Sequence, residues 1–559
     1  MSQRTLPKIR LASQVLFFGL FLFLLFRTEF HGSFGTAGSA VRIPWPVGLF
    51  LEANPLVAAA NALSTHALYR NLLWSLAILV PTFFLGRAFC GWVCPLGTLN
   101  HYFGHLRSER KRGGRLLESN RYKRWQTAKY YILVAVLVAA AAGTALVGIV
   151  DPIALTVRSL TLSVLPAISY ALNAVMDGLY ASGLGPLKLV ADVLQFLLQS
   201  TLVSFKQPYF RQAVVVGVLF ILILGLNFRV TRFWCRALCP LGALLGACSR
   251  WTLLGLVQDP SECDSRNRCL QHCQGGDDPI PGPPWRKAEC HLCFNCVGEC
   301  PTSGITFRFL APPATTISVP QLQRRKLLTG IAAGAGLLPL MRSTTGLAVE
   351  QDARLVRPPG SLDEARFLER CIRCGACMKV CPNNALHPSL AEGGLEALWT
   401  PVLVPRVGYC EPNCVLCSQV CPTGAIWEIT EQEKLGRPAV KQTDGTETPA
   451  IDPIRIGTAF YDRGRCLPWA MATECIVCEE WCPTSPKAIF LLPAEAIDSL
   501  GTTKTVRQPY VDAHRCIGCG ACEYACPVRD RPAVYVTSVG ETRSKTNQFL
   551  LQRAPRRIR

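Results

Sequence analysis

The sequence predicts a membrane α-helical bundle of four or more spans, followed by small cysteine-rich α+β domains. Three observations lead to this prediction. Half of the 559 residues are hydrophobic, yet the formal net charge is +20. Apolar runs near the roughly 20 residues that cross a bilayer alternate with basic loops. Finally, the chain has 28 cysteines, and nearly all stand in tight groups, unlike the dispersed cysteines of a disulfide scaffold.

Residues 1–250 are predicted to form the transmembrane part. Four apolar runs are the predicted spans: 11–26, 67–85, 130–150 and 212–228. The basic residues beside them place the N-terminus, the loop 101–128 and the segment after Phe228 in the cytoplasm. Residues 160–205 are apolar but contain three acidic or basic side chains, so they are either interfacial helices or two extra spans.

The basic charge does not require a nucleic-acid partner, because positive-inside loops account for much of it. The sequence shows no G-x-G-x-x-G after a strand, no P-loop and no C-x-x-C-H haem-attachment motif. Nucleotide binding and covalent haem attachment are therefore not predicted, and the cysteines carry the functional prediction.

A near-identical segment occurs twice at the cytoplasmic ends of predicted spans. The first, residues 89–97, reads F-C-G-W-V-C-P-L-G, and the second, residues 234–242, reads W-C-R-A-L-C-P-L-G. The repeat indicates two related halves of the membrane domain. If the spans continue as helices, C-x-x-x-C places both thiols on one face, so the four could hold one cluster, act as redox thiols, or simply pack as small residues. These candidate cofactor-binding residues are Cys90, Cys94, Cys235 and Cys239.

The dominant unit downstream is C-x-x-C-x-x-C-x-x-x-C-P, which places three thiolates around one cubane [4Fe–4S] cluster and sends the fourth to a neighbouring cluster. Residues 251–310, predicted to be a cytoplasmic ferredoxin-type domain, contain one such run and three cysteines with irregular spacing before it. The predicted ligands are Cys263, Cys269, Cys273, Cys290, Cys293, Cys296 and Cys300. Seven ligands are one short of two clusters, so one or two are predicted. Cys248 or His272 could supply the missing ligand, although a lone buried cysteine or a surface histidine is commoner.

Residues 320–345 begin with basic residues, including Arg324 and Arg325, and continue as a short apolar run. A paired arginine before a modest apolar stretch is typical of a twin-arginine export signal. The alternative is an ordinary short span with a basic cytoplasmic flank. Both interpretations place the following domain in the periplasm.

Residues 350–545 are predicted to form a periplasmic ferredoxin-like domain with four [4Fe–4S] clusters. Two of its cysteine runs are complete, and two are stretched before the second cysteine. The ligands are Cys371, Cys374, Cys377, Cys381, Cys410, Cys414, Cys417, Cys421, Cys466, Cys475, Cys478, Cys482, Cys516, Cys519, Cys522 and Cys526. Structural zinc sites rarely add third and fourth cysteines at these spacings. We expect nested sharing of ligands, first run with fourth and second with third, and we expect loops at 431–452 and 492–509.

On these motifs, residues 1–310 resemble the NapH/MauN family of membrane ferredoxin-type proteins. The resemblance depends on C-G-W-x-C-P-L-G, on C-R-x-L-C-P-L-G-A-L and on the run after the last span. Residues 320–545 resemble the NapG/MauM family of exported polyferredoxins, through the twin-arginine leader, the segment R-P-P-G at 357–360 and four runs in this order. The chain therefore resembles a fusion of two proteins that are elsewhere separate partners.

The resemblance implies an iron–sulfur electron-transfer protein of the bacterial inner membrane, with a cytoplasmic N-terminus and a periplasmic C-terminal domain. Its expected partners are the quinone pool and a periplasmic reductase or c-type cytochrome, so it would serve mainly as an electron carrier within a quinol dehydrogenase. The alternative is a membrane redox or assembly factor that matures a metalloenzyme. A redox sensor is a third possibility, but no DNA-binding or signalling module supports it.

Overall fold

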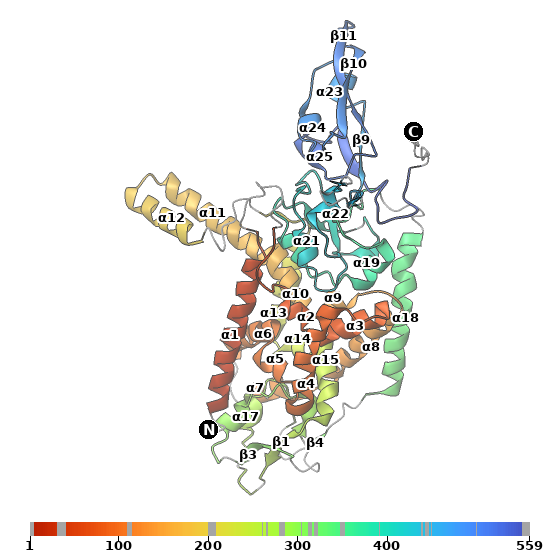
Figure 1. Cartoon of the computed structure of the whole chain (residues 1–559). Coiled ribbons are helices and arrows are strands. Elements are labelled where there is room, and N and C mark those ends of the chain that lie inside the picture. Colours follow the sequence, from red (N-terminus) through yellow and green to blue (C-terminus); the bar gives the residue numbers. More distant parts are fainter. Residues whose placement is uncertain are drawn as a thin grey trace.

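The computed structural model shows three parts arranged along one long axis (Figure 1). A lower cysteine-rich domain lies at one end, a helical bundle in the middle and an upper cysteine-rich domain at the other end. The N-terminus lies near the lower domain. The structure describes residues 5–549 apart from 31–40, 109–113, 199–207, 260, 264–265, 279–284, 303, 311–315, 318–321, 347–352, 391, 438–439, 442–446, 449 and 499.

The helical bundle is built from the N-terminal part of the chain and one later helix, α18, which packs along α8. Figure 1 shows α1 and α18 running along opposite flanks, and the α11–α12 hairpin projecting from the side. The helices are α1 (Leu6–Arg27), α2 (Leu49–Glu52), α3 (Pro55–Thr65), α4 (Leu76–Leu85), α5 (Ala88–Trp92), α6 (Pro95–Ser108), α7 (Gly114–Asn120), α8 (Ala128–Ala141), α9 (Val147–Val150), α10 (Pro152–Ser159), α11 (Leu165–Ala181), α12 (Gly185–Leu198), α13 (Ala213–Gly225), α14 (Phe233–Ala237), α15 (Pro240–Cys248) and α18 (Arg324–Gly346).

Polar caps fix where two central helices begin. Asn54 Oδ1 accepts a hydrogen bond from the N–H of Leu56 at 3.0 Å. Asp151 Oδ2 accepts from the N–H groups of Ile153 and Ala154 at 3.1 and 2.8 Å. Each cap precedes a proline at the first helical position, where a missing N–H costs nothing. Because Asn54 Nδ2 also donates to Asp151 Oδ1 at 2.6 Å, the starts of α3 and α10 are held together.

Two helices of the described chain are long and apolar enough to cross a membrane, namely Leu6–Arg27 and Pro152–Ala181. Two shorter apolar helices cover Arg70–Leu85 and Ala213–Phe228. The prediction of four full spans is therefore not confirmed, although each predicted run contains a helix.

The predicted span over 130–150 is interrupted. Helix α8 ends at Ala141, and Gly143 follows with a φ of 89°. This left-handed conformation terminates a helix, and glycine adopts it without a steric penalty. Residues 160–205, for which interfacial helices or two extra spans were expected, contain the whole of α11 and α12, joined to α10 by a π-helical turn over Leu160–Val164.

The bundle exposes apolar side chains and buries charged ones. Exposed apolar residues on α1 and α13 include Leu11, Val15, Leu16, Val214, Val218 and Ile221. The fully buried charged residues include Arg87, Lys129, Arg158, Arg232 and Arg236. A water-soluble protein normally shows the reverse distribution, whereas lipid-facing helices expose apolar residues and turn ionisable ones inward.

The lower domain (residues 254–317) pairs short strands around its cysteine loops. Strands β1 and β3 are antiparallel, with Leu256 opposite Phe307, and β2 and β4 are parallel. Its elements are β1 (Leu254–Gln258), α16 (Arg268–Gln271), β2 (Trp285–Arg286), α17 (Asn295–Glu299), β3 (Ile305–Phe309) and β4 (Thr316–Ile317).

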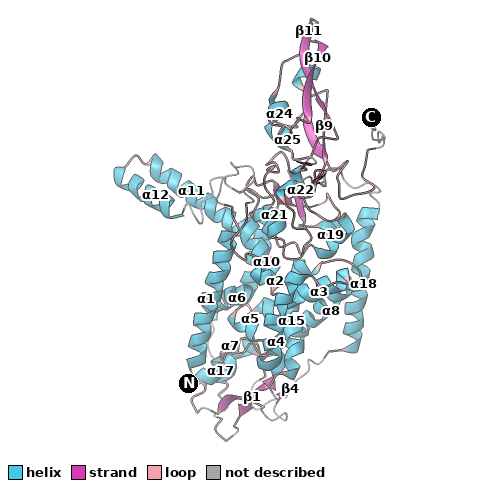
Figure 2. Cartoon of the chain, viewed as in Figure 1, coloured by secondary structure: helices cyan, strands magenta, loops and turns pink. Residues whose placement is uncertain are grey.

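The upper domain (residues 353–549) consists of short helices and two-stranded sheets joined by long loops (Figure 2). The strand pairs are β5–β6, β7–β8, β9–β12 and β10–β11, all antiparallel. The elements are α19 (Glu364–Arg370), α20 (Ala376–Lys379), β5 (Leu386–Pro388), β6 (Pro401–Leu403), α21 (Leu416–Gln419), α22 (Glu431–Leu435), β7 (Val440–Lys441), β8 (Glu447–Thr448), β9 (Thr458–Tyr461), α23 (Leu467–Ala470), α24 (Val477–Glu480), β10 (Ile489–Ile497), β11 (Thr503–Val511), α25 (Ala521–Ala525) and β12 (Val534–Thr537).

The predicted loop at 492–509 is wrong, because β10 and β11 form a long hairpin that projects at the far end of the upper domain (Figure 1). Each strand contains a proline, Pro493 or Pro509, which cannot donate a ladder hydrogen bond. A two-stranded ribbon has only edge strands, and edges tolerate proline. The described part of 431–452 likewise contains α22, β7 and β8 rather than loop alone.

Candidate iron–sulfur sites

The sixteen cysteines of the upper domain gather into four groups. Two groups line cavities, and each combines the first three cysteines of a complete run with one cysteine of another run. In the other two groups the thiols act on one another electrostatically across runs. We name them site 1 (Cys371, Cys374, Cys377, Cys421), site 2 (Cys381, Cys410, Cys414, Cys417), site 3 (Cys466, Cys475, Cys478, Cys526) and site 4 (Cys482, Cys516, Cys519, Cys522).

The pairing of the runs differs from the expected nested order. Each run gives three thiols to its own site and its last cysteine to a neighbour, as predicted, but the first run exchanges with the second and the third with the fourth. Packing explains this outcome, because α20 packs against α21 and α24 packs against α25. Sequential elements joined by short connections are usually neighbours in space.

Glycine shapes the loop in both complete runs. Gly375 and Gly520 follow the second cysteine of their runs, and both have a φ of 82°. This left-handed conformation bends the backbone so that the next turn, α20 or α25, presents the third cysteine to the same site. A side chain at either position would be strained.

The chemistry of these thiols fits a multi-iron cluster. Burial raises the pKa of Cys374 and that of Cys414, each to about 12, so thiolates at these positions need bound cations to compensate their charge. Among the described residues, no three His, Cys, Asp or Glu side chains converge closely enough to hold a single metal ion. Four thiols around a cavity are instead the arrangement that a cubane cluster requires.

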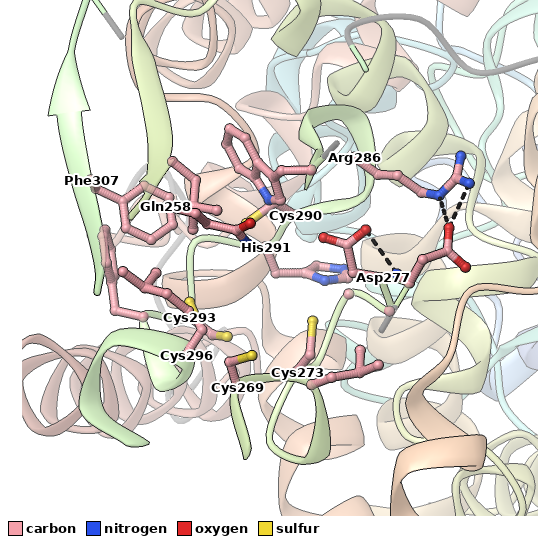
Figure 3. A pocket seen from close by; sticks show the side chains of 18 residues that line it. Gln258, Cys269, Cys273, Asp277, Arg286, Cys290, His291, Cys293, Cys296 and Phe307 are labelled. Atoms are coloured by element: carbon pink, nitrogen blue, oxygen red, sulfur yellow. Dashed lines mark hydrogen bonds and ion pairs between the residues drawn. The ribbon is translucent and has the colours of Figure 1, made fainter. Parts of the chain in front are cut away.

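The lower domain gathers four of its cysteines into one group, the inner lower site (Cys273, Cys290, Cys293 and Cys296). They line one cavity together with Cys269 and His291 (Figure 3). The His291 ring is buried, and neither ring nitrogen has a hydrogen-bond partner among the described residues. Buried polar groups are rarely left unpaired, so the ring nitrogens suit a bound acceptor such as a cluster sulfide.

The repeated C-x-x-x-C-P segments meet inside the bundle and form the bundle thiol site (Cys90, Cys94, Cys235 and Cys239). All four residues are buried, and their thiols interact with one another electrostatically. Gly242 N–H donates to Cys239 Sγ at 3.2 Å at the start of α15. Within the described chain, Arg87 and Arg232 have buried guanidinium N–H groups without partners. Such donors suit a negatively charged group, either four thiolates or the cluster that they would hold.

The lower domain is attached directly to the bundle thiol site. Trp92 Nε1, between Cys90 and Cys94, donates to Leu292 O at 2.9 Å. A Cβ at Gly91 would clash with His291 O, so this glycine permits the close approach. Glu289 lies buried among Lys129, Arg87 and Tyr130 of the bundle and forms ion pairs with the first two. The inner lower site is therefore fixed against the segment that carries the bundle thiols.

The upper domain is attached to the bundle at site 1. Arg373, between Cys371 and Cys374, donates to Ala145 O at 2.5 Å, and Arg158 of α10 donates to Arg373 O at 3.1 Å. The Arg158 guanidinium also lies over the Trp399 ring at 4.6 Å. A Cβ at Gly148 would clash with the Ile372 carbonyl, which shows how closely the two surfaces meet.

The sequence predicted the cysteines that the structure gathers into groups, but it missed the residues that position them. Arg158, Arg373 and His291 carry no motif of their own, and only the last two had a usable signal, since they stand between cysteines of a run. Cys248 lies at the end of α15, which packs mainly on helices of the bundle. His272 Nε2 lies 3.9 Å from Glu299 Oε2 at the surface of the lower domain.

Comparison with known proteins assigns the same chemistry to these segments. Residues 68–113 and 212–254 match a family model described as a 4Fe-4S binding domain. A second model with the same description matches residues 367–387 and 509–529. These segments contain both C-x-x-x-C-P motifs and all eight cysteines of the two complete upper runs. No solved structure matches the chain.

Three similar proteins illustrate the relationship. The ferredoxin-type protein NapG of Escherichia coli (strain K12) is 34% identical over 224 residues, which are 39% of this chain and 86% of that protein. The methylamine utilization ferredoxin-type protein MauM of Paracoccus denitrificans is 35% identical over 200 residues, 34% of this chain and 74% of that protein. The ferredoxin-type protein NapF of E. coli is 32% identical over 185 residues, 32% of this chain and 85% of that protein.

Proposed function

Because the chain is an iron–sulfur electron-transfer protein that belongs to the family of the ferredoxin-type proteins NapG and MauM, we propose that it carries electrons from membrane quinol to a periplasmic reductase or c-type cytochrome. A [4Fe–4S] cluster, when bound, accepts and releases one electron at a time. The polypeptide binds the clusters, sets their order and keeps water away from them.

The observation that carries this proposal is the arrangement of the cysteine groups in series. The inner lower site adjoins the bundle thiol site through Trp92 and Leu292. Helix α10 continues the line, since Asp151 at its start interacts with Cys94 and Arg158 at its end interacts with Cys374 of site 1.

The series continues through the upper domain. The Cys377 thiol of site 1 interacts with Cys417 of site 2. The N–H of Cys410 of site 2 donates to Cys519 O of site 4 at 2.8 Å. The Cys522 thiol of site 4 interacts with Cys478 of site 3. The sites thus follow the order 1, 2, 4, 3 away from the bundle, and site 3 lies beside the protruding β10–β11 hairpin (Figure 1).

The surface and the ends of the bundle support a membrane location. Many of its outer side chains are apolar while several charged side chains are buried, and α1 and Pro152–Ala181 have the length of a span. Lys8 and Arg10 at the start of α1, together with the basic loop before α8, favour the cytoplasm for the lower end. The upper domain then lies in the periplasm, and quinol reaches the bundle from the bilayer.

The buried arginines position the first upper site on the bundle. Arg158 and Arg373 bind backbone carbonyls across the contact, and their charges lie near the thiols of site 1. Positive charge near a cysteine thiol favours its ionised form, the thiolate, which is the form that binds iron.

The test uses anaerobically purified full-length protein in detergent, to which a reduced menaquinol analogue is added. We expect the broad visible absorption of the clusters to bleach, and electron paramagnetic resonance to show several interacting reduced clusters. A protein that dithionite reduces fully but quinol does not reduce would contradict the proposal and favour a role in metalloenzyme maturation.

A variant at the contact sharpens the test. Gly148→Ala inserts a methyl group where Ile372 O already lies, so it should separate site 1 from the bundle and slow the quinol-dependent bleaching of the upper clusters. Gly178→Ala in α11 is the matched control, because nothing lies within 4 Å of a Cβ there. Equal rates in both variants would show that the contact does not lie on the electron path.

A further inference from the structure

The first cysteine run of the lower domain has the spacing of a regular run, but another residue replaces its second cysteine. Cys263, Cys269 and Cys273 occupy the first, third and fourth positions of C-x-x-C-x-x-C-x-x-x-C, and Arg266 occupies the second. The spacing of five and three residues, which seemed irregular, is therefore the ordinary spacing without its second cysteine.

The backbone supports this alignment. In the complete runs, the residue after the second cysteine has a positive φ, namely 57° at Phe294 and 82° at Gly375 and Gly520. Asn267, directly after Arg266, has a φ of 54°. Short helices then carry the third cysteine, Cys269 in α16 as in the other runs. The segment therefore folds as a cluster-binding run, and Arg266 stands where a ligand normally stands.

The remaining thiols form a second group, the outer lower site (Cys263, Cys269 and Cys300). Cys273 belongs to the inner lower site. The last cysteine of the other run, Cys300, lies with the first run, because the Cys269 thiol interacts electrostatically with Cys263 and Cys300. Helix α16 packs on α17, and Asn295 Nδ2 donates to His272 O at 3.1 Å, so the two runs are held in the reciprocal arrangement of paired ferredoxin runs. This arrangement gives the inner site four thiols and the outer site three.

Arg266 cannot take the place of the missing cysteine. A guanidinium has five N–H donors, no acceptor lone pair and a permanent positive charge, so it cannot ligate iron. Its side chain is exposed, whereas Cys293 and Cys374 at the equivalent position are buried. Of the two other candidate ligands, Cys248 ends α15 in the bundle, and the His272 ring faces the carboxylate of Glu299, with Nε2 3.9 Å from Oε2.

We propose that Cys263, Cys269 and Cys300 hold a three-iron [3Fe–4S] cluster. This cluster is a cube that lacks one corner iron, and it needs three thiolates rather than four. By the spacing of the run, position 266 would supply the ligand of the missing corner iron, and an arginine there offers a positive charge and no thiolate. The lower domain then contains two clusters of different type, a [4Fe–4S] cluster at the inner site and a three-iron cluster at the outer site.

The experiment uses electron paramagnetic resonance on full-length protein. The protein is purified anaerobically, and its clusters are then oxidised with a mild redox dye. Oxidised [4Fe–4S] clusters are diamagnetic, whereas an oxidised [3Fe–4S] cluster is paramagnetic, so the outer lower site should give a signal against a silent background. We expect about one spin per chain. In Arg266→Cys, the restored ligand should complete a [4Fe–4S] cluster, and the oxidised signal should be lost.

Two further variants control for damage and for misfolding. Arg266→Ala also removes the arginine but restores no ligand, so it should keep the signal of the unaltered protein. Cys300→Ser removes one of the three ligands and should abolish that signal. An unaltered protein without the oxidised signal would overturn the proposal. A signal that persists undiminished in Arg266→Cys would overturn it as well, because the signal would then arise from damage to other clusters.

Discussion

At the scale of the residue, spacing alone predicted the cysteine groups of the upper domain, because three thiols within seven residues, as in the two complete runs, can surround only something small. It could not identify which distant cysteine completes each site. Cys421 joins the first run and Cys482 the fourth, and these partners depend on how helices pack. The supporting residue Arg158 was missed for the same reason, since its role arises only when remote segments meet, whereas His291 stands between two cysteines of a run.

The pairing of the runs can be tested by counting iron. Cys374→Ala and Cys421→Ala should each remove one cluster, about four irons per chain. Because both residues belong to site 1, the double variant should lose no more iron than either single variant. Iron and acid-labile sulfide analysis of the purified proteins gives this result directly.

The matched comparison combines Cys374→Ala with Cys526→Ala, which belongs to site 3. This pair should lose about eight irons, because two clusters are removed. Nested pairing predicts the opposite outcome for both double variants, with about eight irons lost from the first pair and about four from the second. That result would overturn the assignment of the sites.

At the scale of the element, the sequence located the helices better than their ends. Apolar runs marked the cores of α1, α8 and α13, but the left-handed residue Gly143 shortened the third predicted span. The β10–β11 hairpin was missed because its prolines and polar residues do not alternate as in a half-buried strand. In the described chain its two strands pair with each other and with no further strand, and their buried residues follow no regular alternation, so the sequence carries no such pattern.

Helix α18 offers a test of packing at this scale. Gly330 and Gly334 are spaced as G-x-x-x-G and face α8, a pattern that lets two membrane helices approach closely. A Cβ at Gly334 would lie 2.5 Å from Ala135 O and 3.0 Å from Val138 Cβ. Gly334→Leu should therefore overpack this contact and cost about 1–3 kcal/mol, measured as a lower unfolding temperature of the detergent-purified protein.

The same helix supplies the control. A Cβ at Gly336 has nothing within 4 Å, so Gly336→Leu should leave the unfolding temperature nearly unchanged. Equal unfolding temperatures of the two leucine variants would mean that α18 does not pack on α8 in the folded protein. That result is expected if the twin-arginine segment is only a transient export signal.

At the scale of the whole molecule, the chain joins two cysteine-rich domains through a helical bundle that contains a third group of thiols (Figure 1). The order of these parts could be predicted, because each has its own motif and composition. Their contacts could not, since they depend on single small residues such as Gly91 and Gly148 that let backbones touch. These contacts turn separate binding sites into a continuous series.

The most direct test of electron transfer from quinol to the periplasmic side uses proteoliposomes that contain the full-length protein. A reduced menaquinol analogue is placed in the bilayer, and a membrane-impermeant one-electron acceptor is added outside. In the population with the upper domain outside, we expect acceptor reduction well above that of protein-free vesicles. The opposite orientation, with the acceptor outside and the lower domain exposed, should give much slower reduction. If neither orientation reduces the acceptor although dithionite reduces all clusters, the protein does not transfer electrons from quinol to the periplasmic side.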